Sequence, residues 1–217
     1  MKDKENLTDR IGQLYTGAVH DVMRVQGFKD FVLPPDIRPL DASTRAFGPI
    51  FTVEGKMADI SAHDYLLRWT EFLSRAPADH VVMCQPNNQE VALMGELSAE
   101  TLQGKGVRGF IVDGGCRDTS FILKSKFPVF HSFFTPKDVV GRWIPTNFES
   151  VIRIGDVKIN PSDFVLADLD GVVIIPGDVA NEIISATEAV SSTENKVRKA
   201  ILGGMDPTEA YKIFGKF

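Results

Sequence analysis

The sequence predicts one α/β domain, because apolar runs typical of strands alternate along the chain with amphipathic stretches typical of helices. The length of 217 residues fits a single compact core, and 43% hydrophobic with 24% charged residues is ordinary for a globular protein. No internal repeat or low-complexity segment interrupts the alternation. We therefore expect residues 1–217 to form one domain.

Each expected helix carries apolar residues three or four positions apart, and each expected strand is a short apolar run bounded by turn residues. In chain order the expected elements are a helix at 8–26 that Thr16 can restart as an N-cap, a strand at 48–53, a helix at 64–75, a strand at 80–84, a helix at 95–103, a strand at 109–113, a helix at 119–126, a strand at 128–134, a meander at 151–175, and helices at 178–202 and 206–215. Prolines keep residues 31–40 out of regular pairing, Gly155-Asp156 marks a hairpin, and Asp206-Pro207 marks a helix start.

The stretch from Gly95 to Asp118 (GELSAETLQGKGVRGFIVDGGCRD) contains a helix, a glycine-rich turn, a buried strand and an Arg-Asp pair. A helix of about ten residues and a strand of about five each cover roughly 15 Å. If the strand returns alongside the helix, Arg117 and Asp118 finish at the level of Glu96. The expected inner face of this helix consists of Leu97, Ala99 and Leu102.

This folding-back would place two carboxylates, a guanidinium and a helix N-terminus on one rim, which suits an anion site beside a hard-cation site. Asp118 would ligate Mg²⁺ or Mn²⁺ directly, and Glu96 would hold one of the metal's waters. Arg117 would bind a carboxylate or carbonyl oxygen of the substrate. The substrate carboxylate would lie on the backbone N–H groups of Met94, Gly95, Glu96 and Leu97. A structural alternative stays open, in which Asp118 only caps the next helix and pairs with Arg117 at the surface.

The composition argues against several classes of function. A formal net charge of −5 at pH 7 gives no sign of the basic patch expected on a nucleic-acid-binding surface. Cys84 and Cys116 make neither a disulfide framework nor a zinc motif, and Cys116 is expected to be a small apolar filler. The charged start MKDKENLTDR and the lack of a run of about 20 apolar residues predict a cytoplasmic protein without a signal peptide or membrane helix.

Several motif-like features are expected to be structural. Residues 104–109 match G-x-G-x-x-G, but they end a helix and open a strand, the reverse of a dinucleotide site. Residues 168–171 (DLDG) lack the other ligands of a calcium loop and fit a hairpin turn. His20 beside Asp21, and His131 in a strand, are also expected to have structural roles.

The spacing of twenty residues between Glu96 and Arg117-Asp118 resembles the acid-x20-Arg-Asp signature of the 4-hydroxy-4-methyl-2-oxoglutarate aldolase family. That family shares its fold with the regulator of ribonuclease activity A proteins. The resemblance covers most of the chain through the segments TGAVHDVM (16–23), FGPIFTV (47–53), GELSAETLQGKGVRGFIVDGGCRD (95–118), FPVF (127–130), TPKDVVGR (135–142) and VKINPSDFVLADLDGVVIIP (157–176). It implies an α/β fold with a central sandwich-like β-sheet flanked by helices, similar to the swivelling phosphohistidine (β/β/α) domain. The chain departs from the family at 85–88 (QPNN), where a glycine-rich segment would shape the pocket wall.

The resemblance implies a divalent-metal-dependent aldolase that cleaves a 4-hydroxy-2-oxo acid to pyruvate through a stabilised enolate, with oxaloacetate decarboxylation as a related activity. It also implies that a glutamate from the C-terminal helix of an adjacent subunit reaches the metal's waters. Glu194 is the best match for this glutamate, and Glu188 is the alternative. The resembling family is trimeric or hexameric, so the C-terminal helices (178–217) are expected to contribute to subunit contacts.

Two alternatives to this function are kept. One is a non-catalytic oligomeric module that binds a ribonuclease. Regulators of that kind typically lack the complete set of acid, arginine and aspartate, which this chain keeps at Glu96, Arg117 and Asp118. The other is an enzyme with the same site that acts on a different 2-oxo acid.

Overall fold

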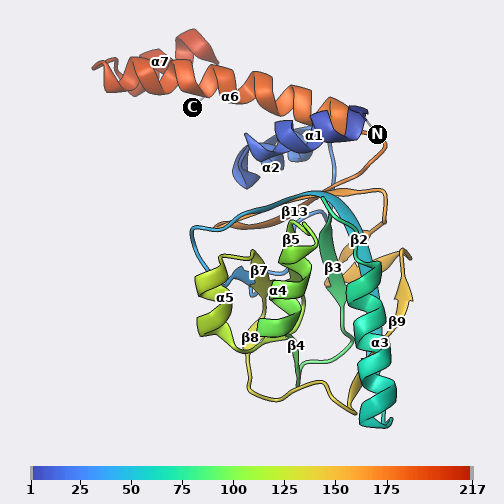
Figure 1. Ribbon diagram of the computed structural model, residues 1–217. Helices are drawn as coiled ribbons and strands as arrows, with labels where there is room; N and C mark the ends of the chain where they lie inside the picture. Colours follow the sequence, from blue (N-terminus) through green and yellow to red (C-terminus); the bar gives the residue numbers. More distant parts are fainter. Residues whose placement is uncertain (1, 216–217) are drawn as a thin grey trace.

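The structure, a computed structural model, describes residues 2–215 and has an α/β fold in which helices flank a central β-sheet (Figure 1). The helices are α1 (Lys2–Gly12), α2 (Thr16–Val25), α3 (Ala62–Arg75), α4 (Glu96–Gly104), α5 (Thr119–Ser125), α6 (Ala180–Leu202) and α7 (Pro207–Phe214). The strands are β1 (Arg38–Pro39), β2 (Ala46–Met57), β3 (Val81–Gln85), β4 (Ala92–Met94), β5 (Gly109–Val112), β6 (Gly115–Cys116), β7 (Val129–His131), β8 (Phe133–Phe134), β9 (Trp143–Phe148), β10 (Ile152–Ile154), β11 (Val157–Ile159), β12 (Phe164–Asp168) and β13 (Gly171–Ile175). The predicted alternation of strands and helices is confirmed.

The main sheet of the described chain has eight strands. Their order is β1-β7-β5-β3-β2-β12-β13, and β9 pairs with the outer part of β2. The neighbours β2, β3, β5 and β7 are parallel, whereas β12 and β13 form an antiparallel hairpin beside β2. Helices α3, α4 and α5 connect successive parallel strands, as parallel pairing requires a crossover.

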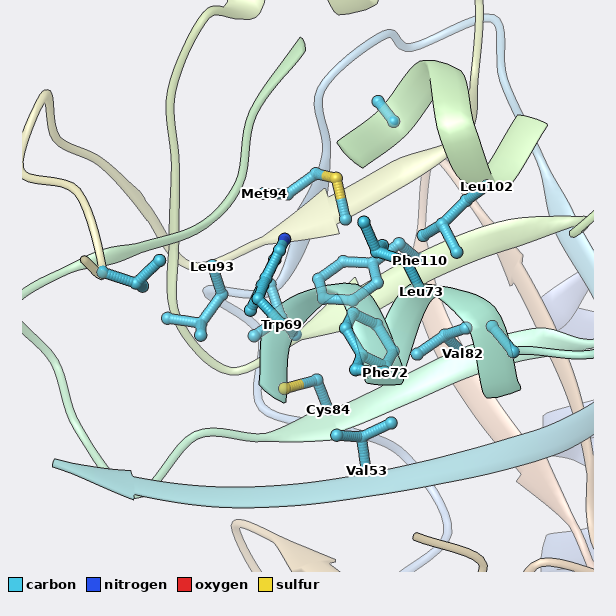
Figure 2. Close-up of a cluster of buried hydrophobic side chains, with 14 of the residues drawn as sticks. Val53, Trp69, Phe72, Leu73, Val82, Cys84, Leu93, Met94, Leu102 and Phe110 are labelled. Atoms are coloured by element: carbon cyan, nitrogen blue, oxygen red, sulfur yellow. The ribbon is translucent and has the colours of Figure 1, made fainter. Parts of the chain in front are cut away.

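The two faces of the main sheet are buried by different elements. Successive residues of a strand point to opposite faces, so Val82 and Phe110 belong to one cluster and Val81 and Ile111 to another. The first cluster lies under α3 and α4, where aromatic side chains such as Trp69 meet strand residues (Figure 2). On the opposite face the small hairpin β10–β11 contributes its four apolar residues. This second layer of strands gives the sandwich-like character that the resemblance implies.

A second, three-stranded parallel sheet positions the candidate site. In this sheet β6 lies between β4 and β8, with Cys116 opposite both Met94 and Phe134. Gly115 allows the three strands to approach, because a Cβ there would lie 2.8 Å from a ring carbon of Phe133 and from the carbonyl oxygen of Val91. The residues that follow β4, β6 and β8 therefore emerge side by side.

Two boundaries differ from the sequence prediction. The helix expected from residue 8 begins earlier, as α1 from Lys2, and a break separates it from α2, which starts at Thr16, the residue where a restart was predicted. The guanidinium of Arg45 donates hydrogen bonds to the carbonyl oxygens of Gly12 and Leu14, which holds this break. The strand expected at 128–134 is divided into β7 and β8, which belong to different sheets.

The motif-like features have the structural places that were predicted. Residues 168–171 form the turn of the β12–β13 hairpin, and the Asp168 carboxylate accepts hydrogen bonds from the backbone N–H (2.9 Å) and hydroxyl (2.7 Å) of Thr16. His131 is buried with its Nδ1 3.0 Å from the carbonyl oxygen of Phe133, and burial lowers its pKa. Residues 104–109 connect α4 to β5.

Helices α6 and α7 lie at the end of the molecule opposite β4 and β8, with α1 and α2 beneath them (Figure 1). Arg10 of α1 donates hydrogen bonds of 2.8 Å to both carboxylate oxygens of Glu188 on α6. The Tyr15 hydroxyl, just before α2, donates a hydrogen bond of 2.5 Å to Glu194. None of the helices in the described chain combines the length and apolarity needed to cross a membrane.

Candidate functional site

The candidate site consists of the residues that directly follow the three short parallel strands. Residues 95–96 follow β4, residues 117–118 follow β6, and Thr135 follows β8. The backbone N–H of Arg117 donates to the carbonyl oxygen of Met94 at 2.9 Å, so the ladder continues to the start of the Arg-Asp pair. Segments that leave the carboxyl ends of neighbouring parallel strands converge, which makes this edge a common place for ligands.

The predicted juxtaposition is confirmed for the backbone of Glu96 and the carboxylate of Asp118. The backbone N–H of Glu96 donates to Oδ2 of Asp118 at 3.2 Å, although 22 positions separate the two residues. Asp118 has left-handed backbone angles, with φ 54° and ψ 31°. It occupies the N-cap position of α5, but its carboxylate makes no capping hydrogen bond there. The capping part of the structural alternative is therefore wrong, since the carboxylate instead faces the start of α4, whereas its surface pair with Arg117 is present.

Gly95 leaves room for the Asp118 carboxylate. A Cβ at Gly95 would lie 2.6 Å from Oδ2 of Asp118 and 3.3 Å from Nε of Arg117. The backbone of Gly95 is extended, with φ −143° and ψ 178°, which any residue can adopt. Glycine is thus required here by the space that Asp118 occupies and not by the backbone conformation.

Arg117 lies beside this carboxylate and keeps its terminal nitrogens available. Its Nε is 3.4 Å from Oδ2 of Asp118, and the side chains of Arg117 and Asp118 are 39% and 38% exposed. Among the described residues, the two terminal nitrogens of Arg117 have no hydrogen-bond partner. A planar guanidinium with free N–H groups can bind the oxygens of a carboxylate or an oxyanion.

A hollow of about 340 Å³ lies over the pair and is lined by residues 116–119 and 134–136. Sites for small ligands typically measure roughly 300–1,000 Å³. Within this lining Arg117 is the cation and Asp118 the anion, while Phe134 and Pro136 are apolar. Cys116 is buried, and burial raises the pKa of its thiol to about 12, so the thiol stays protonated as expected for an apolar filler.

The backbone N–H groups and the inner face of α4 differ from the prediction. Of the four N–H groups assigned to a substrate carboxylate, that of Glu96 is already bound to Asp118. Leu97, expected on the inner face, is 77% exposed, whereas Ala99 and Leu102 are buried as predicted. The assignment of Glu96 N–H to the substrate is therefore wrong in this structure.

The segment 85–88 does not line the hollow, so its predicted role as pocket wall is wrong for this chain. The indole Nε1 of the buried Trp143 donates to the carbonyl oxygen of Pro86 at 2.7 Å. Asn87 donates to the carbonyl oxygen of Gly55 at 2.9 Å. These bonds hold the segment against β2 and β9.

Within a single chain, Glu194 lies far from the candidate site. Glu194 lies on α6, at the other end of the molecule, and is bound to Tyr15 of its own chain (Figure 1). The alternative, Glu188, is paired with Arg10 in the same region. A role for Glu194 in the site of an adjacent subunit therefore stays a prediction.

The sequence reading missed Tyr65 and Phe134 as neighbours of the site. Tyr65 is buried in the first turn of α3, and its phenol interacts electrostatically with Asp138 and Arg117. Burial raises the pKa of Tyr65, the charge of Asp138 adds to the rise, and Arg117 opposes it. No local sequence pattern marks either residue as part of the site. Phe134 reaches the hollow only because it belongs to the two-residue strand β8.

The chemistry of Asp118 fits a hard divalent cation. Its Oδ2 faces the N–H of Glu96 and Arg117, while Oδ1 has no hydrogen-bond partner among the described residues. Within residues 2–215 no group of three or more His, Cys, Asp or Glu side chains is arranged to hold a metal. A cation here would have Asp118 as its protein ligand from this chain, and Mg²⁺, which retains several waters, accepts such a site.

Three known proteins compare with this chain. A provisionally named 4-hydroxy-4-methyl-2-oxoglutarate aldolase of Halalkalibacterium halodurans is 25% identical over 183 residues, which are 82% of each chain. A crystal structure described as "novel cellulases from microbes associated with the gut ecosystem" is 34% identical with a TM-score of 0.82, covering 88% of this chain and 86% of that one. RraAS2 of Streptomyces coelicolor, described as an unusual member of the RNase ES inhibitor RraA family, is 21% identical with a TM-score of 0.78, covering 89% of this chain and 96% of that one. At this identity the similarity shows only that the two proteins share a fold.

Two further curated relatives are matched over only part of their length, namely 32% of Protein DlpA from Legionella pneumophila and 56% of an uncharacterized Methanocaldococcus jannaschii protein. The family model described as RraA-like (Aldolase/RraA) matches residues 16–174, most of this chain. The matched region contains Glu96, Arg117 and Asp118. The chain therefore belongs to the RraA-like family.

Proposed function

We propose that this protein is a divalent-metal-dependent aldolase that cleaves a 4-hydroxy-2-oxo acid to pyruvate, with oxaloacetate decarboxylation as a related activity. The observation that carries the proposal is the left-handed Asp118, whose carboxylate lies at the start of α4 beside Arg117 and under a hollow of small-ligand size. Membership of a family described as Aldolase/RraA supports a lyase.

Retro-aldol cleavage breaks the bond between C3 and C4 and leaves an electron pair on C3, which is delocalised onto the 2-oxo oxygen. Mg²⁺ or Mn²⁺ held by Asp118 would supply positive charge at that oxygen. The free N–H groups of Arg117 would hydrogen-bond the same oxygen or the adjacent carboxylate, and such preorganised donors favour the charge as it develops. Decarboxylation of oxaloacetate leaves the same electron pair on C3 when carbon dioxide departs. One arrangement of charges therefore serves both reactions.

Two carboxylates complete the proposal. Glu96, the first residue of α4, would take the proton of the C4 hydroxyl through a water, as a general base. Glu194 would act through water from an adjacent subunit, which makes a homo-oligomer part of the active form. The C-terminal helices α6 and α7 would then contribute to subunit contacts.

The experiment compares wild type with Asp118→Asn, which keeps the shape of the side chain but removes its negative charge. Pyruvate formation is measured from oxaloacetate and from 4-hydroxy-2-oxo acids with added Mg²⁺ or Mn²⁺, against a reaction with metal and no protein. The variant should lose the metal-dependent activity, whereas Asp59→Asn, at an exposed position, should keep it. Wild-type activity that persists in excess chelator would refute the role of the metal.

The alternative function is a non-catalytic module that binds a ribonuclease. It predicts that no 2-oxo acid yields pyruvate above the protein-free control and that Asp118→Asn changes nothing measurable in this assay. The free N–H groups of Arg117 and the hollow beside them favour the enzyme, because a surface that only binds a protein does not need them.

A further inference from the structure

The hollow at the proposed active site has a charged side and an apolar side. Arg117 and Asp118 form the charged side, and Phe134 with Pro136 forms the apolar side. The register of the small parallel sheet fixes this division, because Phe134 lies opposite Cys116, the residue immediately before Arg117. Arg117 and Phe134 thus border the same hollow from neighbouring strand ends.

The Phe134 ring is held in place and remains available to a ligand. Its centroid lies 4.4 Å from that of the buried His131, which provides a packed surface behind it. Phe134 is nevertheless 64% exposed, so a face of the ring is open to the hollow. An aromatic side chain in this position offers a large apolar contact at low cost in conformational entropy.

The charges of the residues that line the hollow also favour an apolar group beside Phe134. Arg117 is the single cation among the residues that line the hollow, all of which the structure describes, and it is already needed for the 2-oxo acid end of the substrate. A second carboxylate at C4 would lie against Phe134 and Pro136, where no lining residue of this chain other than Arg117 carries a positive charge to pair with it. Burying an unpaired charge is costly, whereas an apolar group in the same place gains from leaving water.

Resting on the proposed function, we infer that the preferred substrates are 4-hydroxy-2-oxo acids with an aromatic or bulky apolar group at C4, and that Phe134 determines this specificity. The reaction balances without a further reactant. The C3–C4 bond breaks, the C4 hydroxyl gives up its proton and becomes the carbonyl of an apolar aldehyde, and C3 takes up a proton to give pyruvate.

The test uses two substrates that differ only at C4, namely 4-hydroxy-2-oxo-4-phenylbutanoate and 4-hydroxy-2-oxoglutarate, with pyruvate as the common product. Wild type with Mg²⁺ or Mn²⁺ should favour the phenyl substrate in kcat/KM by roughly tenfold or more, the scale of apolar discrimination in a pocket. Phe134→Ala should remove most of this preference, chiefly through KM for the phenyl substrate. Phe134→Arg should shift the preference towards the C4 carboxylate.

Phe121→Ala is the matched control, because Phe121 is also a partly exposed phenylalanine, at 48%, but does not line the hollow. It should leave the ratio of the two kcat/KM values unchanged. Equal or greater activity on 4-hydroxy-2-oxoglutarate, or an unchanged ratio in Phe134→Ala, would overturn the inference while leaving the aldolase intact. Pyruvate from oxaloacetate but from neither of these substrates would also overturn the inference, and pyruvate from none of the three would refute the proposed function itself.

Discussion

The substitution Gly95→Ala tests the geometry of the site most directly. It would place a Cβ 2.6 Å from Oδ2 of Asp118, so the carboxylate must move by about half an ångström or more to restore a normal contact. The extended backbone at Gly95 accepts alanine, so the change acts through this contact. Loss of the bond from Glu96 N–H and of glycine at an N-cap should cost about 1–2 kcal/mol of unfolding free energy.

The effect of Gly95→Ala on catalysis should exceed its effect on stability. A displacement approaching 1 Å of a catalytic group can cost about a hundredfold in rate, so kcat/KM for metal-dependent pyruvate release should fall by roughly tenfold to a hundredfold. Urea unfolding measures the stability term in parallel. Gly104→Ala is the control, because a Cβ at that end of α4 meets nothing within 4 Å. A fully active Gly95→Ala enzyme would show that the position of the Asp118 carboxylate does not matter.

Four further outcomes are expected. Gly55→Ala should lose about 3 kcal/mol of unfolding free energy in urea titrations, since its Cβ would lie 1.9 Å from Cζ2 of Trp143, and an unchanged midpoint would contradict that packing. Arg117→Ala should lower kcat/KM by about a hundredfold or more, as removal of an oxyanion donor does, with little change in melting temperature. Glu194→Gln should reduce pyruvate release without altering the oligomer seen by light scattering, and an intact rate would remove Glu194 from the site. The hydrogen bond to Glu194 raises the pKa of Tyr15 to about 12, above the ordinary value of 10. The stability that this bond contributes should therefore be complete below pH 10 and lost as the pH rises from 10 to 12. Tyr15→Phe should flatten the fall of unfolding free energy over this pH range.

The sequence was sufficient for the backbone of the candidate site because the relevant geometry is local. A helix and a strand of known rise connect Glu96 to Arg117 and Asp118, so their lengths alone return the chain to one level. The same reasoning placed the strand within this stretch and the helix that follows it within one residue of the bounds of β5 and α5. Turn chemistry was equally local, and Asp206 caps α7 through hydrogen bonds from Thr208 and Glu209 as its sequence predicts.

What the sequence did not show depends on contacts between distant segments. The break between α1 and α2 is held by Arg45, about 30 positions further along the chain, so the restart at Thr16 could be named from the sequence but the contact that holds it could not. Strand β8 is two residues long, too short for a periodic pattern, so Phe134 could not be assigned to the wall of the hollow. Leu97 has an apolar side chain at a helical position, yet it is exposed because the first turn of α4 lies at the rim.

The conformation of Asp118 is difficult to explain by stability alone. A left-handed backbone costs a non-glycine residue about 1 kcal/mol or more, although aspartate tolerates it better than most. An ordinary N-cap aspartate would avoid that cost and stabilise α5 by about 1 kcal/mol. The partly exposed contact with Arg117 and the hydrogen bond from Glu96 N–H each return only about 1 kcal/mol, so together they do no more than offset these two losses. The chain thus gives up a helix cap and keeps glycine at position 95 to hold one carboxylate at the start of α4, an arrangement expected where the carboxylate is needed for chemistry.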